Sequence, residues 1–117
     1  LPLSTIAKNH PTYSTDMWRG GVWLNLNYFA IKGLMNYGYK DLAEELKEKT
    51  LAAVNKWDKK TGAIFEFFDS ADKEIPYKCE RKGKPSTPPD WRKHVHSIID
   101  FNWSACFTLM FIQNELY

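Results

Sequence analysis

Two of the three helices that the sequence predicts are apolar on nearly every side, which constrains the fold more than any other feature. Between Val22 and Tyr37, apolar residues occupy almost every face of a helix that Gly38 is suited to end. Eight of the ten residues from Trp103 to Ile112 are also apolar. Helices of this kind are buried on most sides. Because three helices cannot cover so much apolar surface for one another, we expect this chain to pack against further protein.

The helix between these two is amphipathic. Asp41 and Glu44 have the spacing of a capping box at its start, and Thr61-Gly62 breaks the chain at its end. Asn102 is the expected N-cap of the last helix. The pattern therefore predicts an all-α chain of three long helices joined by substantial loops.

Two segments are expected to be irregular. Residues 1–16 carry Pro, Ser and Thr without periodicity, and residues 70–96 form a long polar stretch with several prolines. The long stretch holds a basic cluster, for which we expect a solvated loop rather than a binding site; its members are Lys78, Arg81, Lys82 and Lys84.

Composition excludes several classes of protein. The chain has 117 residues, enough for one small domain, and a net charge of +2, too small for an electrostatic nucleic-acid binder. No apolar run reaches the roughly 20 residues of a membrane helix. Its two cysteines, Cys79 and Cys106, have no zinc-site spacing and are expected to be free thiols; we expect no metal and no cofactor. Aromatic residues, at 15%, are too many for one small core, so some should pack outside the chain or line a cleft.

Glu66 is the most unusual carboxylate because Phe65, Phe67 and Phe68 surround it in the sequence. An ionised Glu is seldom placed among rings unless it is paired or catalytic. In an extended segment Glu66 would point away from Phe65 and Phe67 and to the same side as Phe68. Spacing alone favours the simpler interpretation, a Glu at a strand edge that reaches solvent between buried rings.

A second dense stretch runs from Asp16 to Tyr28 and contains Trp18, Arg19 and Trp23. Tryptophan faces stack on the apolar faces of sugar rings, while Arg and Asn donate hydrogen bonds to hydroxyls. The stretch therefore fits a carbohydrate pocket. A plain core role for its rings is equally compatible with composition.

These stretches resemble a known family. Residues 18–28, Trp-Arg-Gly-Gly-Val-Trp-Leu-Asn-Leu-Asn-Tyr, are similar to the Tyr-Trp-Arg-Gly-Pro-Val-Trp-Ile-Asn-(Ile/Leu)-Asn-Tyr signature of glycoside hydrolase family 63. Residues 62–69 resemble its Gly-x-(Phe/Leu)-(Tyr/Val)-Glu-(Tyr/Lys)-(Phe/Tyr)-Asp segment, and residues 101–105 its Phe-(Ser/Gly)-Trp-Thr-Ala element. The family includes enzymes of the mannosylglycerate hydrolase and processing α-glucosidase type, and family 37 trehalases are more distantly similar. The motifs occur in the same order and span nearly the whole chain.

The resemblance implies that residues 1–117 form a single partial domain, the C-terminal segment of an (α/α)6 toroid built from helical hairpins. It implies inverting hydrolysis of α-glucosides or α-mannosides, with Glu66 as general base and with Trp18 and Arg19 bordering the sugar. Trp23 is a further candidate for the sugar pocket, although packing is the simpler role for Trp23 and Trp103. Inversion uses two carboxyl groups roughly 6.5 to 9.5 Å apart. The family's acidic partner is an Asp far upstream with no counterpart here, so the isolated chain is expected to be inactive and to need the rest of the barrel or to self-associate.

Two departures from the family pattern stand out. Gly21 replaces the usual Pro, and residues 81–96, rich in Pro and charge, replace a Gly-rich loop. Two alternatives remain: a non-catalytic sugar-binding or interaction domain, and a small complete enzyme that pairs Glu66 with one of its own Asp residues. The candidates are Asp16, Asp69 and Asp100, although Asp69 is more simply a turn residue. The sequence does not identify the sugar or the compartment.

Overall fold

The chain is all-α, as the sequence predicts. A computed structural model describes residues 2–14, 17–81 and 96–114. Along the chain lie η1 (Met17–Arg19), α1 (Leu24–Asn36), α2 (Lys40–Thr61), η2 (Pro76–Lys78) and α3 (Asn102–Ile112). Within these ranges extended segments meet only in isolated antiparallel bridges, and no strand forms.

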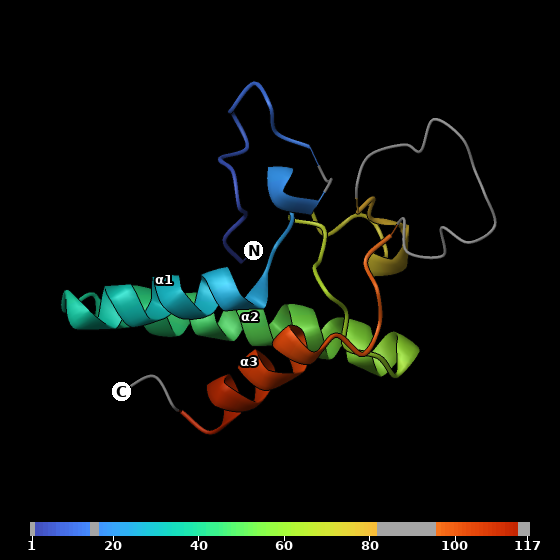
Figure 1. The fold of residues 1–117 in the computed structure, drawn as a ribbon. Coiled ribbons are helices and arrows are strands. Elements are labelled where there is room, and N and C mark those ends of the chain that lie inside the picture. Colours follow the sequence, from blue (N-terminus) through green and yellow to red (C-terminus); the bar gives the residue numbers. More distant parts are fainter. Residues whose placement is uncertain (1, 15–16, 82–95, 115–117) are drawn as a thin grey trace.

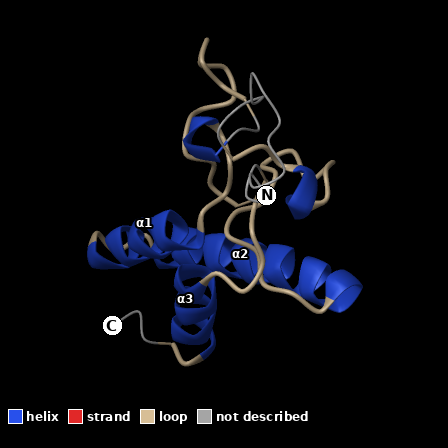
Figure 2. Ribbon diagram, turned by 45° about the vertical axis from the view of Figure 1, so that its right-hand side comes forward, coloured by secondary structure: helices blue, strands red, loops and turns tan. Residues whose placement is uncertain are grey.

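The molecule has a helical layer and a loop layer. The helices α1 and α2 form an antiparallel hairpin and lie side by side, and α3 crosses them on one side (Figure 1). Both short 3-10 turns and the irregular segments gather on the other side of the hairpin, near the start of α1 (Figure 2). Helical hairpins with long loops at one end are the arrangement expected for part of a helical toroid.

The predicted helix ends at Gly38 and Gly62 are confirmed, with backbone φ angles of 84° and 70° that favour glycine. Gly38 N–H donates a hydrogen bond to Met35 O, and Tyr39 N–H donates one to Leu34 O. This pair of hydrogen bonds defines a Schellman turn. This turn leads the chain directly into α2.

Both predicted N-caps are wrong. The N-cap of α2 is Tyr39 and that of α3 is Phe101, and neither makes a side-chain capping bond. The Schellman turn starts α2 at Lys40, which puts Asp41 inside the first turn. Asp100 N–H donates to Ile64 O, and Phe101 follows directly as the N-cap of α3. Asn102 is therefore the first residue of the helix, one position too late in the chain to cap it.

The core lies between the three helices and the segment around Phe65 and Phe68. Burial is one-sided, however, so the two apolar helices are not covered on all sides within this chain. Large apolar side chains of α1 and α3 stay exposed: Leu26, Phe29, Trp103, Leu109 and Ile112. The hairpin and one crossing helix can cover only one face of each, as the excess of apolar helix surface in the sequence predicts. No helix in the described ranges is long and apolar enough to cross a membrane.

Candidate functional site

The segment that carries Glu66 is held at both of its ends and at its centre. Phe65 bridges Ile99, and Phe68 bridges Val22 ahead of α1. At Glu66 itself, the backbone N–H donates to Ile98 O at 2.8 Å. Its carbonyl accepts a hydrogen bond of 3.0 Å from Ser104 Oγ on α3. Three separate parts of the chain therefore fix the backbone of this residue.

The chain bends at Glu66 between the two bridges, so strict alternation of side chains fails. Phe65 and Phe68 both pack into the larger core, whereas Phe67 packs with Trp23 and Cys79 in a second, smaller cluster. The expectation that Phe65 and Phe67 share one side is wrong. A bend lets one short segment supply rings to two clusters.

The carboxylate of Glu66 is buried, with only 1% of the residue exposed. Arg81 Nε lies 3.1 Å from Oε1 and 3.0 Å from Oε2, and Ile98 N–H points at Oε2 from 3.5 Å. The strand-edge interpretation, in which Glu66 reaches solvent, is therefore wrong. Within the basic cluster, Arg81 is not a solvated loop residue but the counter-ion of a buried charge.

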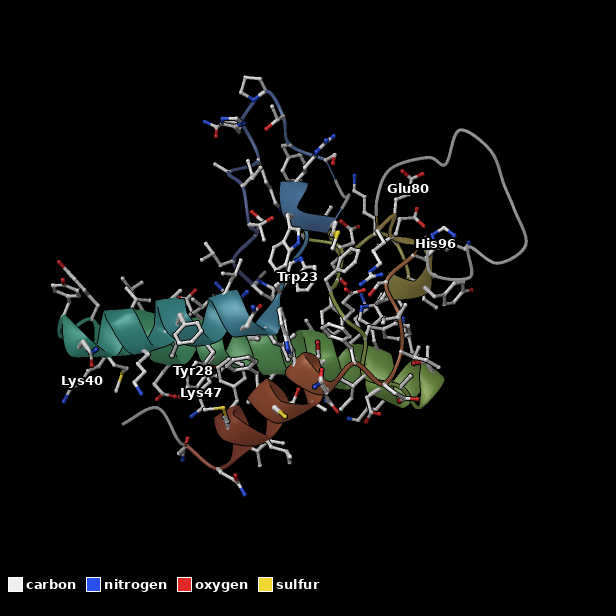
Figure 3. All side chains as sticks on the ribbon, in the orientation of Figure 1. Trp23, Tyr28, Lys40, Lys47, Glu80 and His96 are labelled. Carbon is white, nitrogen blue, oxygen red and sulfur yellow. The ribbon has the colours of Figure 1, made fainter. Side chains whose placement is uncertain are left out.

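A stack of three aromatic rings lies beside this segment. The rings of Trp18 and Trp23 are 3.8 Å apart with an interplanar angle of 9°, and Phe67 lies 5.2 Å beyond Trp23 at 12°. Trp18 is 42% exposed and Trp23 only 2%. Trp23 lies at the junction of the loop layer and α1 (Figure 3) and its Nε1–H donates to Met17 O at 3.1 Å. The stack thus presents the Trp18 end to solvent and buries Trp23 in the middle.

Two glycines after η1 allow close approaches of the chain, and the second of them approaches the stack. A Cβ on Gly20 would lie 2.2 Å from Ser14 O, and one on Gly21 would lie 2.6 Å from Met17 O and 2.9 Å from the Phe67 ring. Gly21 N–H also donates to Met17 O at 3.3 Å, a bond that a proline could not make. The Gly21 departure from the family signature therefore has a structural role in η1.

The remaining predicted residues are dispersed. Arg19 is exposed at the end of η1, and its carbonyl accepts a hydrogen bond of 2.9 Å from Ser14 N. Asp69 organises a turn, as predicted, because its carboxylate accepts bonds from three backbone amides. Asp100 is exposed, with a φ of 54°. Asp16, Lys82 and Lys84 lie outside the described residues.

Asn27 differs most from the sequence interpretation, in which the asparagines of the signature bond sugar hydroxyls. Its exposed fraction is 0%. Its amide accepts from Leu3 N at 2.8 Å and donates to Leu3 O and Trp23 O at 3.0 and 2.8 Å. Asn27 therefore fastens the N-terminal segment to α1.

Sequence reasoning also missed Arg81, which lies 15 residues beyond Glu66, and Ser104, 38 residues beyond it. No spacing rule connects residues so far apart along the chain. The charged residues at positions 78–82 were the available signal for an ionic partner, but their mixed charges favoured a solvated loop.

Both cysteines are free, as predicted. Burial, reinforced by the charges of Asp69 and Glu74, raises the pKa of the Cys79 thiol to about 12, so it is no nucleophile at neutral pH. In the parts of the chain that the structure describes, no group of three His, Cys, Asp or Glu residues could hold a metal ion.

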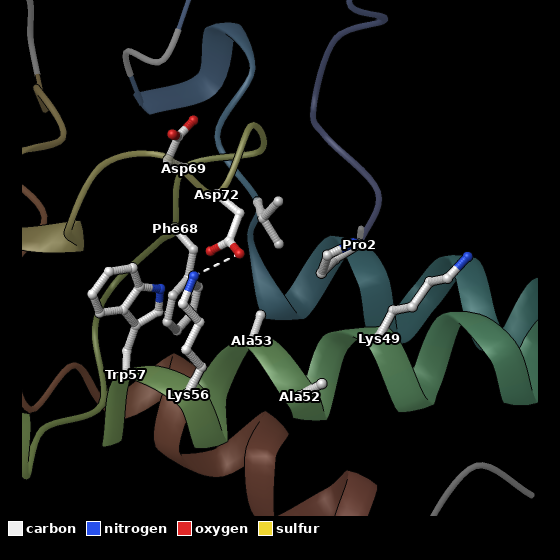
Figure 4. A pocket seen from close by; sticks show the side chains of 10 residues that line it. Pro2, Lys49, Ala52, Ala53, Lys56, Trp57, Phe68, Asp69 and Asp72 are labelled. Carbon is white, nitrogen blue, oxygen red and sulfur yellow. Dashed lines mark hydrogen bonds and ion pairs between the residues drawn. The ribbon is translucent and has the colours of Figure 1, made fainter. Parts of the chain in front are cut away.

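Two cavities lie away from Glu66. One, of about 220 Å³, is lined by Trp57, Phe68 and the Lys56–Asp72 ion pair (Figure 4). The other, of about 650 Å³, lies between α2 and α3 and is lined mainly by apolar residues such as Leu51 and Leu109. Neither is lined by Glu66 or Trp18.

These features belong to a glycoside hydrolase domain. The model of the mannosylglycerate hydrolase MGH1-like glycoside hydrolase domain matches residues 1–104, so the chain belongs to this family.

Individual relatives are mannosylglycerate hydrolases. That of Rubrobacter radiotolerans is 39% identical over 56 residues, covering 48% of this chain and 12% of the relative. Mannosylglycerate hydrolase MGH1 of Selaginella moellendorffii is 39% identical over 51 residues, 44% of this chain and 9% of the relative. The enzyme of Thermus thermophilus is 41% identical over 39 residues, 33% of this chain and 9% of the relative. The match thus spans about a tenth of each relative. No solved structure matches the chain.

Proposed function

We propose that this chain supplies part of the active site of an inverting glycoside hydrolase that acts on α-glucosides or α-mannosides, with Glu66 as the general base. The observation that carries the proposal is a carboxylate held among rings at the second family motif, next to a ring stack with one exposed end. A base in an inverting enzyme takes a proton from the water that attacks the anomeric carbon.

Among the described residues, neither Asp69 nor Asp100 fits the role of the general acid. Asp69 is fully engaged in its turn, and Asp100 lies on the exposed surface. Neither is placed to protonate a leaving group opposite Glu66. We therefore propose that the 117-residue chain alone is inactive and that the apolar faces of α1 and α3 pack on further helices of the same barrel.

Trp18 is the proposed sugar platform, because its indole is the exposed end of the stack. Trp23, buried beneath it, would support the sugar platform indirectly, by holding the orientation of the Trp18 ring through stacking. Arg19, exposed on the same turn, can donate hydrogen bonds to hydroxyls or to a carboxylate.

The substrate class follows from the relatives, which are named for mannosylglycerate. We propose a glycerate α-glycoside, in which the aglycone carries a carboxylate, as the first substrate to test.

The test is hydrolysis of mannosylglycerate by the full-length protein and its Glu66→Gln and Glu66→Ala variants. Loss of the base should lower kcat by roughly 10²–10⁴-fold. NMR should show the β-anomer as the first sugar product of the unmodified protein. Azide, which needs no base, should restore turnover of the Glu66→Ala variant and give a β-glycosyl azide. The control is Glu74→Gln, which removes an exposed carboxylate and should leave kcat unchanged. An α-anomer product, or an active Glu66→Gln variant, would contradict the proposal.

A non-catalytic sugar-binding role is the second candidate, since one observation favours it: the Trp18 ring is accessible, while the Glu66 carboxylate is sealed. Titration with mannose, glucose and their glycerate glycosides separates the two candidates. Binding that survives Glu66→Ala and disappears in Trp18→Ala, without any hydrolysis by the unmodified protein, would establish the binding role.

A further inference from the structure

Arg81 is the charged partner of Glu66 in this structure. Its Nε lies within 3.1 Å of one carboxylate oxygen and 3.0 Å of the other. Glu66 is 1% exposed and the Arg81 side chain 25% exposed, so the arginine is the member of the pair that reaches solvent. A buried carboxylate needs a counter-charge or hydrogen bonds to be ionised there. Among the described residues, the contact to its oxygens beyond Arg81 is a long one, from Ile98 N at 3.5 Å.

The backbone of Arg81 is brought to this position by contacts of its neighbour. Glu80 pairs with His96 in an antiparallel bridge, and the two lie side by side in Figure 3. Glu80 O also accepts a hydrogen bond of 3.0 Å from Met17 N, the first residue of η1. The turn that presents Trp18 therefore also anchors the residue next to Arg81. Platform, arginine and Glu66 form one connected unit.

We propose that Arg81 is a positioning residue for Glu66: it fixes the orientation of the carboxylate and supplies the positive charge that its burial requires. This rests on the proposed function, in which Glu66 is the base. A carboxylate has about four lone-pair positions. Among the described residues, the two contacts from Arg81 and the one from Ile98 leave one position that can accept a proton from water. Arg81 itself need not touch the sugar.

The structure supplies a matched control. Lys78, at the end of η2, is an exposed cation three residues before Arg81, and its backbone makes a turn bond to Ile75. Removing its charge changes the local basic cluster without touching Glu66.

The experiment compares Arg81→Met, Arg81→Lys and Lys78→Met in the full-length protein by two measurements. The first is steady-state hydrolysis of mannosylglycerate. The second needs no activity: the rate at which a water-soluble carbodiimide couples glycine ethyl ester to Glu66, followed by peptide mass spectrometry.

We expect Arg81→Met to lower kcat by 100-fold or more with KM changed less than threefold. Arg81→Lys, which retains the charge, should recover kcat to within tenfold of the unmodified protein. Coupling at Glu66 should be at least tenfold faster in Arg81→Met, because the carboxylate loses the cation bonded to both of its oxygens and is more readily protonated for reaction with the carbodiimide. Lys78→Met should match the unmodified protein in both measurements.

Each outcome decides one point. An unchanged coupling rate in Arg81→Met overturns the positioning role, and so does a raised KM with unchanged kcat, which would place Arg81 on the substrate. If Arg81→Met does not fold, Arg81→Lys decides: an inactive lysine variant with unchanged coupling overturns the proposal. If the unmodified protein hydrolyses no glycoside, the proposed function fails, while the coupling rates still test the hold of Arg81 on Glu66.

Discussion

Replacement of Asn27 by alanine should destabilise the protein and free its N-terminal segment. The side chain is wholly buried and makes bonds of 2.8, 3.0 and 2.8 Å to Leu3 N, Leu3 O and Trp23 O. Each such bond contributes about 1 kcal/mol net. Against this, alanine favours a helix over asparagine by roughly 0.5 kcal/mol. Asn27→Ala should therefore lower the free energy of unfolding by about 2–3 kcal/mol.

This estimate is smaller than the cost of leaving buried donors and acceptors without partners, because the groups that Asn27 bonds keep or find other partners. Leu3 is half exposed, so its N–H and C=O can bond to water. Trp23 O still accepts its helical bond from Asn27 N at 3.1 Å. Thr50 Oγ1, which lies 3.4 Å from Asn27 Oδ1, still donates to Leu46 O at 2.7 Å. Asn27→Asp should cost more than Asn27→Ala, because it puts a carboxylate at a position with 0% exposure, facing carbonyl oxygens of Leu3 and Trp23 to which it cannot donate.

Urea unfolding of the full-length protein measures both variants, with Asn55→Ala on the exposed side of α2 as the control. The control should stay within about 0.5 kcal/mol of the unmodified protein. Limited proteolysis should cut residues 2–14 faster in Asn27→Ala. Equal stability of Asn27→Ala and the control, or Asn27→Asp as stable as Asn27→Ala, would refute the reasoning.

Three further predictions follow from burial. In a Cys106→Ser background, iodoacetamide should leave Cys79 unmodified at pH 8 until urea unfolds the protein. Because burial raises the pKa of Cys79 to about 12, the unfolded state releases its proton first, so this residue's contribution to stability should be lost as pH rises from 9 to 12 in urea titrations. Arg81→Met should lower the free energy of unfolding by about 3–5 kcal/mol, because it leaves the buried Glu66 carboxylate without its cation. Glu66→Gln should lower it by about 1–2 kcal/mol, because the partly exposed arginine can bond to water instead. Equal losses of stability in urea unfolding would contradict this asymmetry. The isolated chain should bind ANS and self-associate, and Phe29→Glu, on the exposed face of α1, should reduce both in light scattering and fluorescence.

The sequence predicts those parts of the fold that depend on local chemistry. Gly38 and Gly62 end helices because their positive φ angles are costly for other residues. Asp69 forms a turn because its carboxylate reaches amides two to five residues ahead. The N-termini of α2 and α3 could not be placed in this way, since a preceding Schellman turn and a preceding bridge determine where they begin.

Local sequence patterns predict only part of the candidate site. Glu66 is conspicuous among its rings, but the role proposed for it came from family resemblance. The contacts that decide its environment come from Arg81, Ile98 and Ser104, which lie 15 to 38 residues further along the chain. Local patterns assign the first of these to a solvated loop, because charge alone does not reveal a buried partner.

The bend at Glu66 explains why the two parts of the site belong together. Phe67 follows Glu66 directly and forms the inner end of the stack that Trp18 completes. Ser97 Oγ accepts a hydrogen bond from Phe67 N at 3.0 Å and donates one to Phe67 O at 2.8 Å. These two bonds hold the backbone of Phe67 in the interior. Because Glu66 and Phe67 are consecutive residues, the backbone that carries the carboxylate also carries the inner ring of the stack. The bend at Glu66 therefore sets how the exposed Trp18 ring lies relative to Glu66, and the bonds from Ser97 and Ser104 hold the backbone at Phe67 and at Glu66.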